Sequence, residues 1–179
     1  MSTATANGYQ RLAPDTLRIE RVLDAPPETV WRWLVDPALR EQWFAGGTAA
    51  DKEGEFELAF DHDKLSADDV PYPEKYAKSK GSVSKERVLR IQPPRLLTYS
   101  WMGGKEGQVT FELFPSGKQT RLVLTHSGIT GPSPYKSFSG GWLSHLAVLQ
   151  TKLAGGLVRD FWALHARTVA ELSATQPED

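Results

Sequence analysis

The sequence predicts an α+β fold in which an antiparallel sheet is closed by a long C-terminal helix. Apolar and polar residues alternate in short runs between residues 16 and 128, which is typical of strands with one buried face. Glycine and proline turns separate these runs, so the strands are predicted to form an antiparallel meander. After residue 140, apolar residues recur at three- and four-residue steps, which indicates helices.

Length and composition indicate one globular domain. The chain has 179 residues, of which 40% are hydrophobic and 24% are charged, and this balance is typical of a protein that folds around one core. Residues 1–14 are mostly small and polar and show no periodicity, so they are predicted to form a disordered N-terminal tail. We expect one domain over residues 15–173 and a C-terminal tail over residues 174–179.

Charge and cysteine content exclude several classes of function. Lys and Arg number 21 against 22 Asp and Glu, so the chain lacks the basic surface that nucleic-acid binding requires. No apolar run reaches the length of a membrane span and the N-terminus lacks the apolar stretch of a signal peptide, so we expect a cytoplasmic protein. Without cysteine, the chain has no disulfide, no thiolate zinc site and no cysteine nucleophile.

The first predicted strand covers residues 16–24, where apolar side chains alternate with charged ones. Two short helices are predicted after it. A pair of prolines fits the first turn of the first helix. Asp36 is predicted to cap the second helix, which covers residues 37–44 and ends at two glycines.

Alternating patterns predict five further strands. They cover residues 54–60, 81–92, 95–102, 108–114 and 120–128. Between the first two of these strands, residues 61–80 carry two prolines and charges of both signs, which favours a long loop that acts as a lid. The pair Ser116–Gly117 is predicted to form the hairpin turn between the last two strands.

Two helices are predicted in the last third of the chain. The longer one is expected from the pair Gly140–Gly141 to the pair Gly155–Gly156, with one apolar face. A second helix is expected over residues 159–172. The order of elements is therefore a strand, two short helices, a run of antiparallel strands and a closing helical region.

Several strings in this order resemble one known family. VLDAPPETVWRWLVDPALREQWF resembles the opening of the family named for the activator of the heat-shock protein 90 ATPase, within the START-like, pollen-allergen-like (SRPBCC) superfamily. PPRLLTYSW and TRLVLTHSGI resemble its later strands, and GWLSHLAVLQTKLAGG followed by FWALHARTVAEL resembles its closing helix and tail. The resemblance covers residues 16–172.

The resemblance implies a helix-grip fold, which is a strongly curved antiparallel sheet wrapped around a long C-terminal helix. Two early helices close one end, and a cavity lies between the sheet and the helix. Members of the superfamily bind lipids, hormones and polyketides, and some are cyclases or dehydratases. Residues 61–80 depart from the usual pattern, because this segment is longer and more charged than its counterparts.

The leading functional hypothesis is that this cavity binds a small hydrophobic or aromatic molecule, such as a lipid or a polyketide-like metabolite. The predicted ligand-binding residues are Phe56, Phe60, Tyr99, Trp101, Phe111, His126, Trp142, His145 and Leu149. For each aromatic residue, packing in the core is the alternative to ligand contact, because protein interiors are dense.

Catalysis in the same cavity is a second hypothesis, as a cyclase, dehydratase or hydrolase, although no catalytic motif is present. His126 would act as an acid or base in such an enzyme. The alternative is a structural histidine whose ring bonds to a backbone carbonyl or to the hydroxyl of Thr125 or Ser127. For His145, packing is the favoured interpretation. The sequence leaves open whether the protein is an enzyme.

Other sequence features bear on a metal site, a hydrolase triad and protein partners. Asp61, His62 and Asp63 are adjacent and point in different directions, so we predict no metal site and no cofactor. Ser144 and His145 do not face each other on a helix, which argues against a hydrolase triad. The family name suggests a chaperone-cofactor or stress-response protein as a third hypothesis. A homodimer is also left open.

Overall fold

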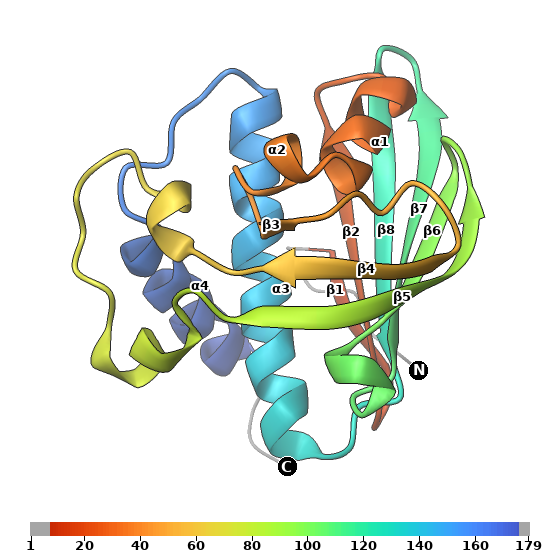
Figure 1. The fold of residues 1–179 in the computed structure, drawn as a ribbon. Helices are drawn as coiled ribbons and strands as arrows, with labels where there is room; N and C mark the ends of the chain where they lie inside the picture. The colour runs from red at the N-terminus through yellow and green to blue at the C-terminus, as the bar shows by residue number, and fades with distance from the viewer. Residues whose placement is uncertain (1–7, 176–179) are drawn as a thin grey trace.

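The computed structural model describes residues 8–175, and these form one eight-stranded antiparallel sheet with helices (Figure 1). The order across the sheet is β1-β2-β8-β7-β6-β5-β4-β3. The strands are β1 (Tyr9–Ala13), β2 (Thr16–Leu23), β3 (Gly46–Gly47), β4 (Gly54–Ala59), β5 (Val83–Gln92), β6 (Leu96–Ser100), β7 (Gln108–Ser116) and β8 (Gln119–Ser127). The six strands predicted from the sequence are all present, with ends within two residues of those expected.

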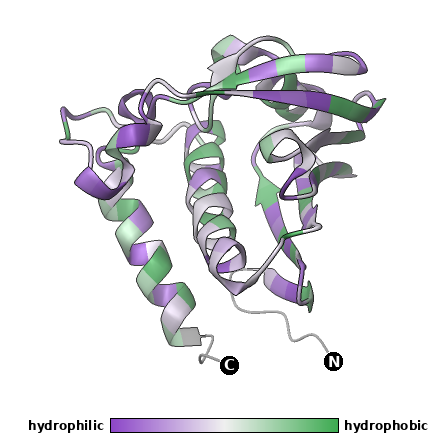
Figure 2. Cartoon of the chain, turned by 60° about the horizontal axis from the view of Figure 1, so that its bottom comes forward, coloured by the Kyte–Doolittle hydropathy of each residue, from purple (hydrophilic) through white to green (hydrophobic). Residues whose placement is uncertain are grey.

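Four α-helices accompany the sheet. They are α1 (Pro27–Val35), α2 (Pro37–Arg40), α3 (Pro132–Leu153) and α4 (Phe161–Thr175), and short 3-10 helices cover His62–Leu65, Glu74–Ser79 and Met102–Gly104. The sheet curves around α3, and α4 packs on the side of α3 that faces away from the sheet (Figures 1 and 2). The predicted α+β helix-grip architecture is therefore confirmed.

The core lies between the curved sheet and α3. Strands β7 and β8 pair over their full length, and their inward side chains are buried, including Phe111, Leu124 and His126. At one end of the sheet, α1 buries Val30 and Leu34, as its pattern predicts. Asp36 caps α2 by accepting a hydrogen bond from the backbone N–H of Ala38. This second helix ends at Arg40, four residues earlier than expected.

The N-terminal tail expected over residues 1–14 is wrong for residues 9–13, which form β1. This edge strand pairs with β2, and Tyr9 lies opposite Ile19. The hydroxyl of Tyr9 donates a hydrogen bond to Tyr135 and lies 3.0 Å from the hydroxyl of Ser139, both on α3. One buried tyrosine thus anchors a strand whose other residues are half-buried or exposed. Residues 1–7 lie outside the described residues.

Helix α3 begins at Pro132 and not at Gly140, so it starts eight residues earlier than predicted, and it ends at Leu153, just before the predicted break at Gly155–Gly156. Both glycines lie inside the helix. Helix α4 continues to Thr175, so the predicted tail over residues 174–179 is corrected at its first two positions. Residues 176–179 lie outside the described residues. No helix in the described part of the chain combines the length and the hydropathy needed to cross a membrane.

Residues 61–80 are predicted as a loop but contain two 3-10 helices. The backbone N–H groups of Ala67 and Asp68 donate to the carbonyls of Val158 and Arg159, just before α4. The hydroxyl of Ser66 in turn accepts a hydrogen bond from the backbone N–H of Phe161. These bonds fasten the segment to the start of α4.

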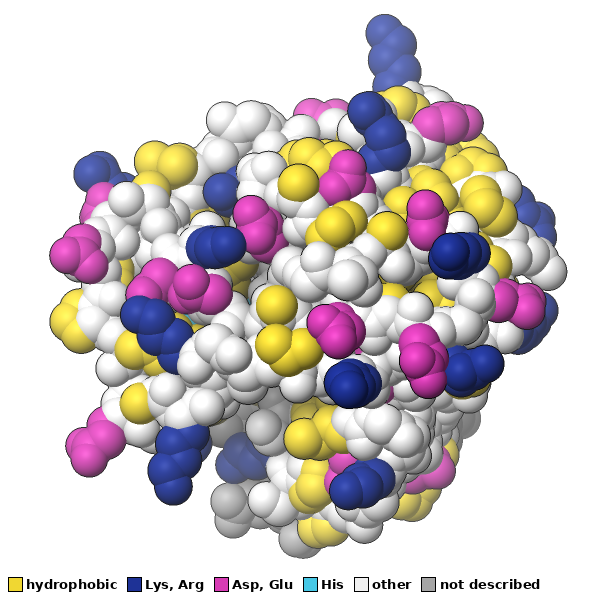
Figure 3. Space-filling view, in the orientation of Figure 1, with side chains coloured by type: hydrophobic (Ala, Val, Ile, Leu, Met, Phe, Trp, Pro, Cys, Tyr) yellow, Lys and Arg dark blue, Asp and Glu magenta, His cyan; other side chains and the backbone are white. Residues whose placement is uncertain are grey.

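The exposed surface carries charges of both signs. Figure 3 shows Lys and Arg side chains interspersed with Asp and Glu side chains over the face seen in Figure 1. This mixture agrees with the net charge of -1. On this face, no extended basic patch of the kind that binds nucleic acid is present.

Candidate ligand-binding site

Aromatic rings in the interior between the sheet and α3 contact one another. The ring centroid of Trp142 lies 4.9 Å from that of Trp101, 5.1 Å from that of Phe44 and 5.9 Å from that of Phe111. Tyr99 lies 5.8 Å from Phe111 in the same way. Such distances are those of packed aromatic pairs.

The structure brings eight of the nine predicted ligand-binding residues into or against this core. Phe56, Tyr99, Phe111, His126, Trp142 and Leu149 are buried, and Phe60 and Trp101 are partly buried. The indole nitrogen of Trp101 is buried and has no hydrogen-bond partner among the described residues. The ninth residue, His145, faces a different region. Ligand contact by the eight core residues stays a prediction.

His126 is held by two hydrogen bonds that fix its protonation. Its Nδ1 accepts from the indole N–H of Trp142 at 3.1 Å, so its Nε2 carries the proton. That Nε2–H donates to the backbone carbonyl of Glu106 at 2.7 Å. Burial lowers the pKa of His126, so the ring is neutral. The interpretation of a histidine bonded to a backbone carbonyl agrees with this geometry.

A separate pocket of about 490 Å³ lies on the other side of α3. Helix α3, helix α4 and the segment 61–80 enclose it. It is lined by His62, Lys75, Tyr76, Ser79, Ser133, Lys136, Ser137, Gly141, His145, Phe161, Trp162, His165 and Val169. Its volume lies within the range typical of small-molecule sites.

Helix α3 presents a face of small side chains to the pocket. Ser133, Ser137, Gly141 and His145 follow one another at four-residue steps, so they lie on one side of the helix. A Cβ atom added at Gly141 would meet nothing within 4 Å. The adjacent Gly140 has another role, because a Cβ there would lie 3.1 Å from Val169 of α4. One glycine therefore allows the two helices to approach, and the next leaves the pocket open.

Aromatic rings form the opposite wall. The ring of Trp162 stacks on that of Tyr76 at a centroid distance of 5.0 Å and an angle of 11°. Phe161 and His165 stack at 5.9 Å and 14°. These rings come from α4 and from the segment 61–80, so the wall depends on the fastening of that segment described above.

Three histidines line the pocket, and each has its pKa lowered chiefly by burial. The pKa of His62 falls to about 4, with His165 as a further cause, and that of His145 falls to about 3, with His62 and His165 as further causes. The pKa of His165 is lowered by burial and by the nearby ammonium of Lys75. All three rings are therefore neutral at pH 7.

Hydrogen bonds hold these rings in place. The Nδ1–H of His145 donates to the backbone carbonyl of Trp43 at 2.9 Å. Nδ1 of His62 lies 2.6 Å from the hydroxyl of Tyr72. The remaining ring, His165, contacts the hydroxyls of Ser144 at 2.8 Å and of Tyr76 at 3.3 Å.

Ser144 pairs with His165 and not with its neighbour His145. Its hydroxyl is fully buried and donates to the backbone carbonyl of Gly140 at 2.7 Å. A nucleophile must reach its substrate, so this buried serine is a structural residue that ties α3 to α4.

The adjacent residues Asp61, His62 and Asp63 have separate partners. Asp61 caps the 3-10 helix His62–Leu65, and Asp63 pairs with Lys80. His62 lines the pocket. Among residues 8–175, no group of three or more His, Asp or Glu side chains is arranged to hold a metal ion.

Of the predicted site residues, only His145 lines this pocket. Sequence reasoning placed Phe161, Trp162 and His165 on a helix but assigned them no ligand. A signal was present, because Phe161, Trp162 and His165 recur at three- and four-residue steps on one face of that helix. Tyr76 gave no comparable signal, since it lies in a segment without periodicity.

The curved sheet gripping a long helix places the protein in the START-like class of helix-grip proteins. The family model described as "Activator of Hsp90 ATPase homolog 1-like protein" matches residues 24–154. The chain belongs to this family, and the resemblance noted in the sequence is confirmed. A search of curated proteins found no match.

Solved structures agree with this assignment. The solution structure of the protein encoded by gene BPP1335 from Bordetella parapertussis is 37% identical, with a TM-score of 0.77, and the match covers 99% of this chain and 96% of that one. CalU16 from Micromonospora echinospora is 20% identical, with a TM-score of 0.63 and coverages of 97% and 92%. DynU16, from the dynemicin biosynthetic locus, is 23% identical, with a TM-score of 0.62 and coverages of 83% and 51%. The last two share the fold.

Proposed function

We propose that the protein reversibly binds a small hydrophobic or aromatic molecule, such as a polyketide-like metabolite, in the pocket between α3, α4 and the segment 61–80. The observation that carries the proposal is a pocket of about 490 Å³ with an aromatic wall and a few fixed polar groups. This combination is typical of small-molecule sites. Membership of a family whose wider class binds such molecules supports it.

In this proposal the ligand binds on the α4 side of α3, whereas the sequence favours a ligand cavity on the sheet side. On the sheet side, the rings of Trp101, Phe111 and Trp142 already contact one another. A guest there would have to separate packed rings, which costs dispersion energy that the guest must restore. On the α4 side, no such separation is needed, because the pocket is open.

The variant Gly141→Leu tests the location. Nothing lies within 4 Å of the position of a Cβ at residue 141, so the leucine side chain extends into the pocket without displacing the core. Leucine also has a higher helix propensity than glycine, so the variant folds. Ala166→Leu on the exposed face of α4 is the matched control, since it adds a leucine to a helix outside the pocket lining.

The probe is 2-naphthalenemethanol, a neutral aromatic molecule. We expect it to raise the melting temperature of the wild type and of Ala166→Leu, because it binds the folded state only. Gly141→Leu should bind at least tenfold more weakly by calorimetry. Equal binding by the two variants would place the probe elsewhere, and the absence of binding to the wild type would overturn the proposal.

A further inference from the structure

The pocket has an unbalanced charge. Among the described residues, its lining contains two lysines, Lys75 and Lys136, and no aspartate or glutamate. The three histidines of the lining are neutral at pH 7, for the reasons given above. A positive charge therefore borders an aromatic pocket that no carboxylate of residues 8–175 lines.

Acidic residues close to the pocket in sequence are engaged elsewhere. Asp63 pairs with Lys80, and Asp68 pairs with Arg159. Asp160 accepts a hydrogen bond from the backbone N–H of Ala163 in the first turn of α4. None of these carboxylates lines the pocket, so none neutralises its lysines.

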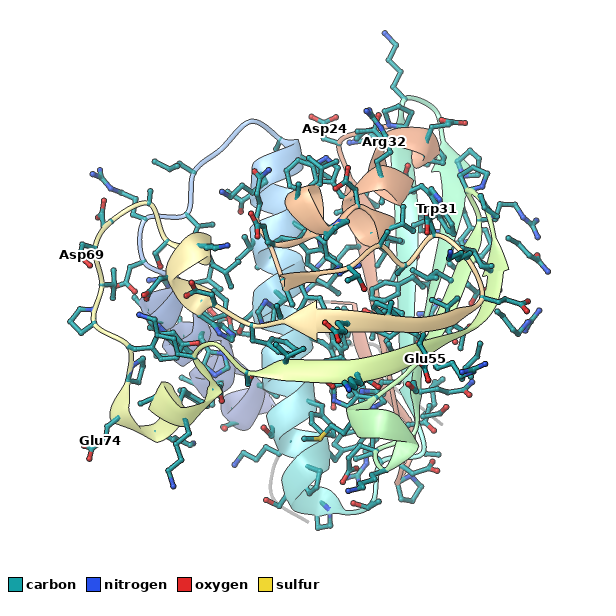
Figure 4. The ribbon with its side chains drawn as sticks, viewed as in Figure 1. Asp24, Trp31, Arg32, Glu55, Asp69 and Glu74 are labelled. Carbon is teal, nitrogen blue, oxygen red and sulfur yellow. The ribbon has the colours of Figure 1, made fainter. Side chains whose placement is uncertain are left out.

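Two further acidic groups of the segment 61–80 point outward. Figure 4 shows Asp69 and Glu74 at its outer edge, directed away from α3 and α4. Helix α3, which carries Lys136, has no acidic residue along its 22 positions. In the described part of the segment 61–80 and of α3, no carboxylate lines the pocket beside the two lysines.

Neither pocket lysine forms an ion pair within the described part of the chain. Two other lysines of the same region do, since Lys64 pairs with Glu41 and Lys80 pairs with Asp63. The ammonium of Lys75 lies 5.3 Å from the ring centroid of Tyr76, which stacks on Trp162. One cation therefore adjoins the aromatic wall directly.

The field of Lys75 extends into the pocket. Lys75 is an exposed residue at the rim, yet its charge contributes to the lowered pKa of the partly buried His165. An anion bound beside Lys75 would offset this field. Aromatic walls next to uncompensated cations are suited to a ligand that combines a ring with a negative group.

We infer that the ligand of this pocket is an aromatic carboxylate, whose ring packs on Trp162 and whose carboxylate pairs with Lys75 and Lys136 at the rim. This inference rests on the proposed function, because it names the chemical class that the same pocket accepts. The contribution of each ion pair is modest, since both ammonium groups are exposed and water screens them. The ring supplies most of the affinity, and the charges supply the preference.

The test compares 2-naphthoate with 2-naphthamide, which have the same ring and differ in charge. Affinities are measured by calorimetry for the wild type, Lys75→Gln, Lys136→Gln and the double variant. Lys78→Gln is the control, because Lys78 lies on the same 3-10 helix as Lys75 but does not line the pocket. Each measurement is repeated at low and high salt.

We expect the wild type and Lys78→Gln to bind naphthoate about three- to tenfold more tightly than naphthamide at low salt, which is the effect of two exposed ion pairs. The preference should shrink at high salt and disappear in the double variant, while the affinity for naphthamide stays the same. Equal affinities for the two probes in the wild type would overturn the inference and leave the proposed function intact. A preference that survives in the double variant would overturn the lysine assignment. If neither probe binds, the proposed function itself fails.

Discussion

On the sheet side of α3, aromatic rings contact one another and His126 bonds to Trp142 and to a backbone carbonyl, whereas on the α4 side the rings border an open pocket. Both sides are rich in aromatic and histidine side chains. The difference lies in which residues face the rings. On the sheet side, the ring of Trp142 of α3 contacts the rings of Trp101 and Phe111. On the α4 side, the rings of α4 border a pocket that Ser133, Ser137 and Gly141 of α3 also line. Aromatic content alone therefore does not mark a ligand site.

Replacing one tryptophan on each side should separate stability from binding. Trp142→Ala removes a buried ring and its hydrogen bond to His126, so it should lower the free energy of unfolding by about 3–5 kcal/mol. Trp162→Ala removes a partly exposed ring of the pocket wall, so it should lower the free energy of unfolding by roughly 1–2 kcal/mol. It should also weaken the binding of the naphthalene probes at least tenfold. Urea unfolding and calorimetry measure the two effects.

The milder variant Trp142→Phe serves as the control if Trp142→Ala does not fold. It keeps a ring in the core but removes the indole N–H that His126 accepts, and it should cost roughly 1–3 kcal/mol. The contrast between a packed sheet side and a ligand-binding α4 side is contradicted if Trp162→Ala destabilises the protein as much as Trp142→Ala. It is also contradicted if Trp162→Ala leaves probe binding unchanged.

The pocket side also predicts a dependence of stability on pH. Burial, followed by the nearby His62, lowers the pKa of His145 from 6.5 to about 3 in the folded protein. Between these values the unfolded chain binds a proton that the folded chain does not bind. The stabilisation is therefore complete above pH 6.5 and is lost as the pH falls towards 3, by an amount on the order of a few kcal/mol.

The variant His145→Asn isolates this contribution. The asparagine amide keeps a donor for the carbonyl of Trp43 but does not titrate. Urea unfolding at pH 7 and pH 4.5 should show a smaller loss of stability in the variant than in the wild type. A remaining loss is expected from His62, whose pKa is lowered to about 4 by burial and by His165. Identical losses in the two proteins would show that His145 is not held neutral.

The sequence predicted β2, the strands β4 to β8 and the two short helices because each carries a local pattern, and it missed β1 and β3. Alternation fixes which side of β7 and β8 faces inward, and the proline pair and Asp36 fix where α1 and α2 begin. The same alternation predicted which side chains face the interior between the sheet and α3. That interior is where the predicted site residues lie.

The pocket could not be predicted in this way, because contacts between distant segments create it. Gly140 and Gly141 resemble a helix start, since glycine is unfavourable inside helices. In the structure, Val169 of α4 packs closely against Gly140, which leaves little room for a side chain there. Gly141 borders the open space of the pocket. Tyr76 contacts His165 and Trp162 of α4, which lie far from it in the sequence, so no local pattern reveals these contacts.

These two glycines should respond differently to the same change. Gly141→Ala should stabilise the protein by about 0.5–1 kcal/mol, because alanine has the higher helix propensity and its Cβ meets open space. Gly140→Ala should be less stable than Gly141→Ala by about 1 kcal/mol, because its Cβ lies 3.1 Å from Val169 and α4 must shift. Thermal unfolding measures the difference, and equal stabilities would contradict the assigned roles.

The smallest effect concerns His165, and it tests whether the charge at the rim reaches into the pocket. The ammonium of Lys75 contributes to the lowered pKa of His165, so Lys75→Gln should raise that pKa towards its ordinary value. Titration of the ring C–H resonances by NMR measures the shift, and Lys78→Gln is again the control. A bound naphthoate should raise the same pKa in the wild type, whereas naphthamide should not add this electrostatic effect. If Lys75→Gln leaves the pKa unchanged, burial alone sets it, and the rim lysine does not act on the pocket.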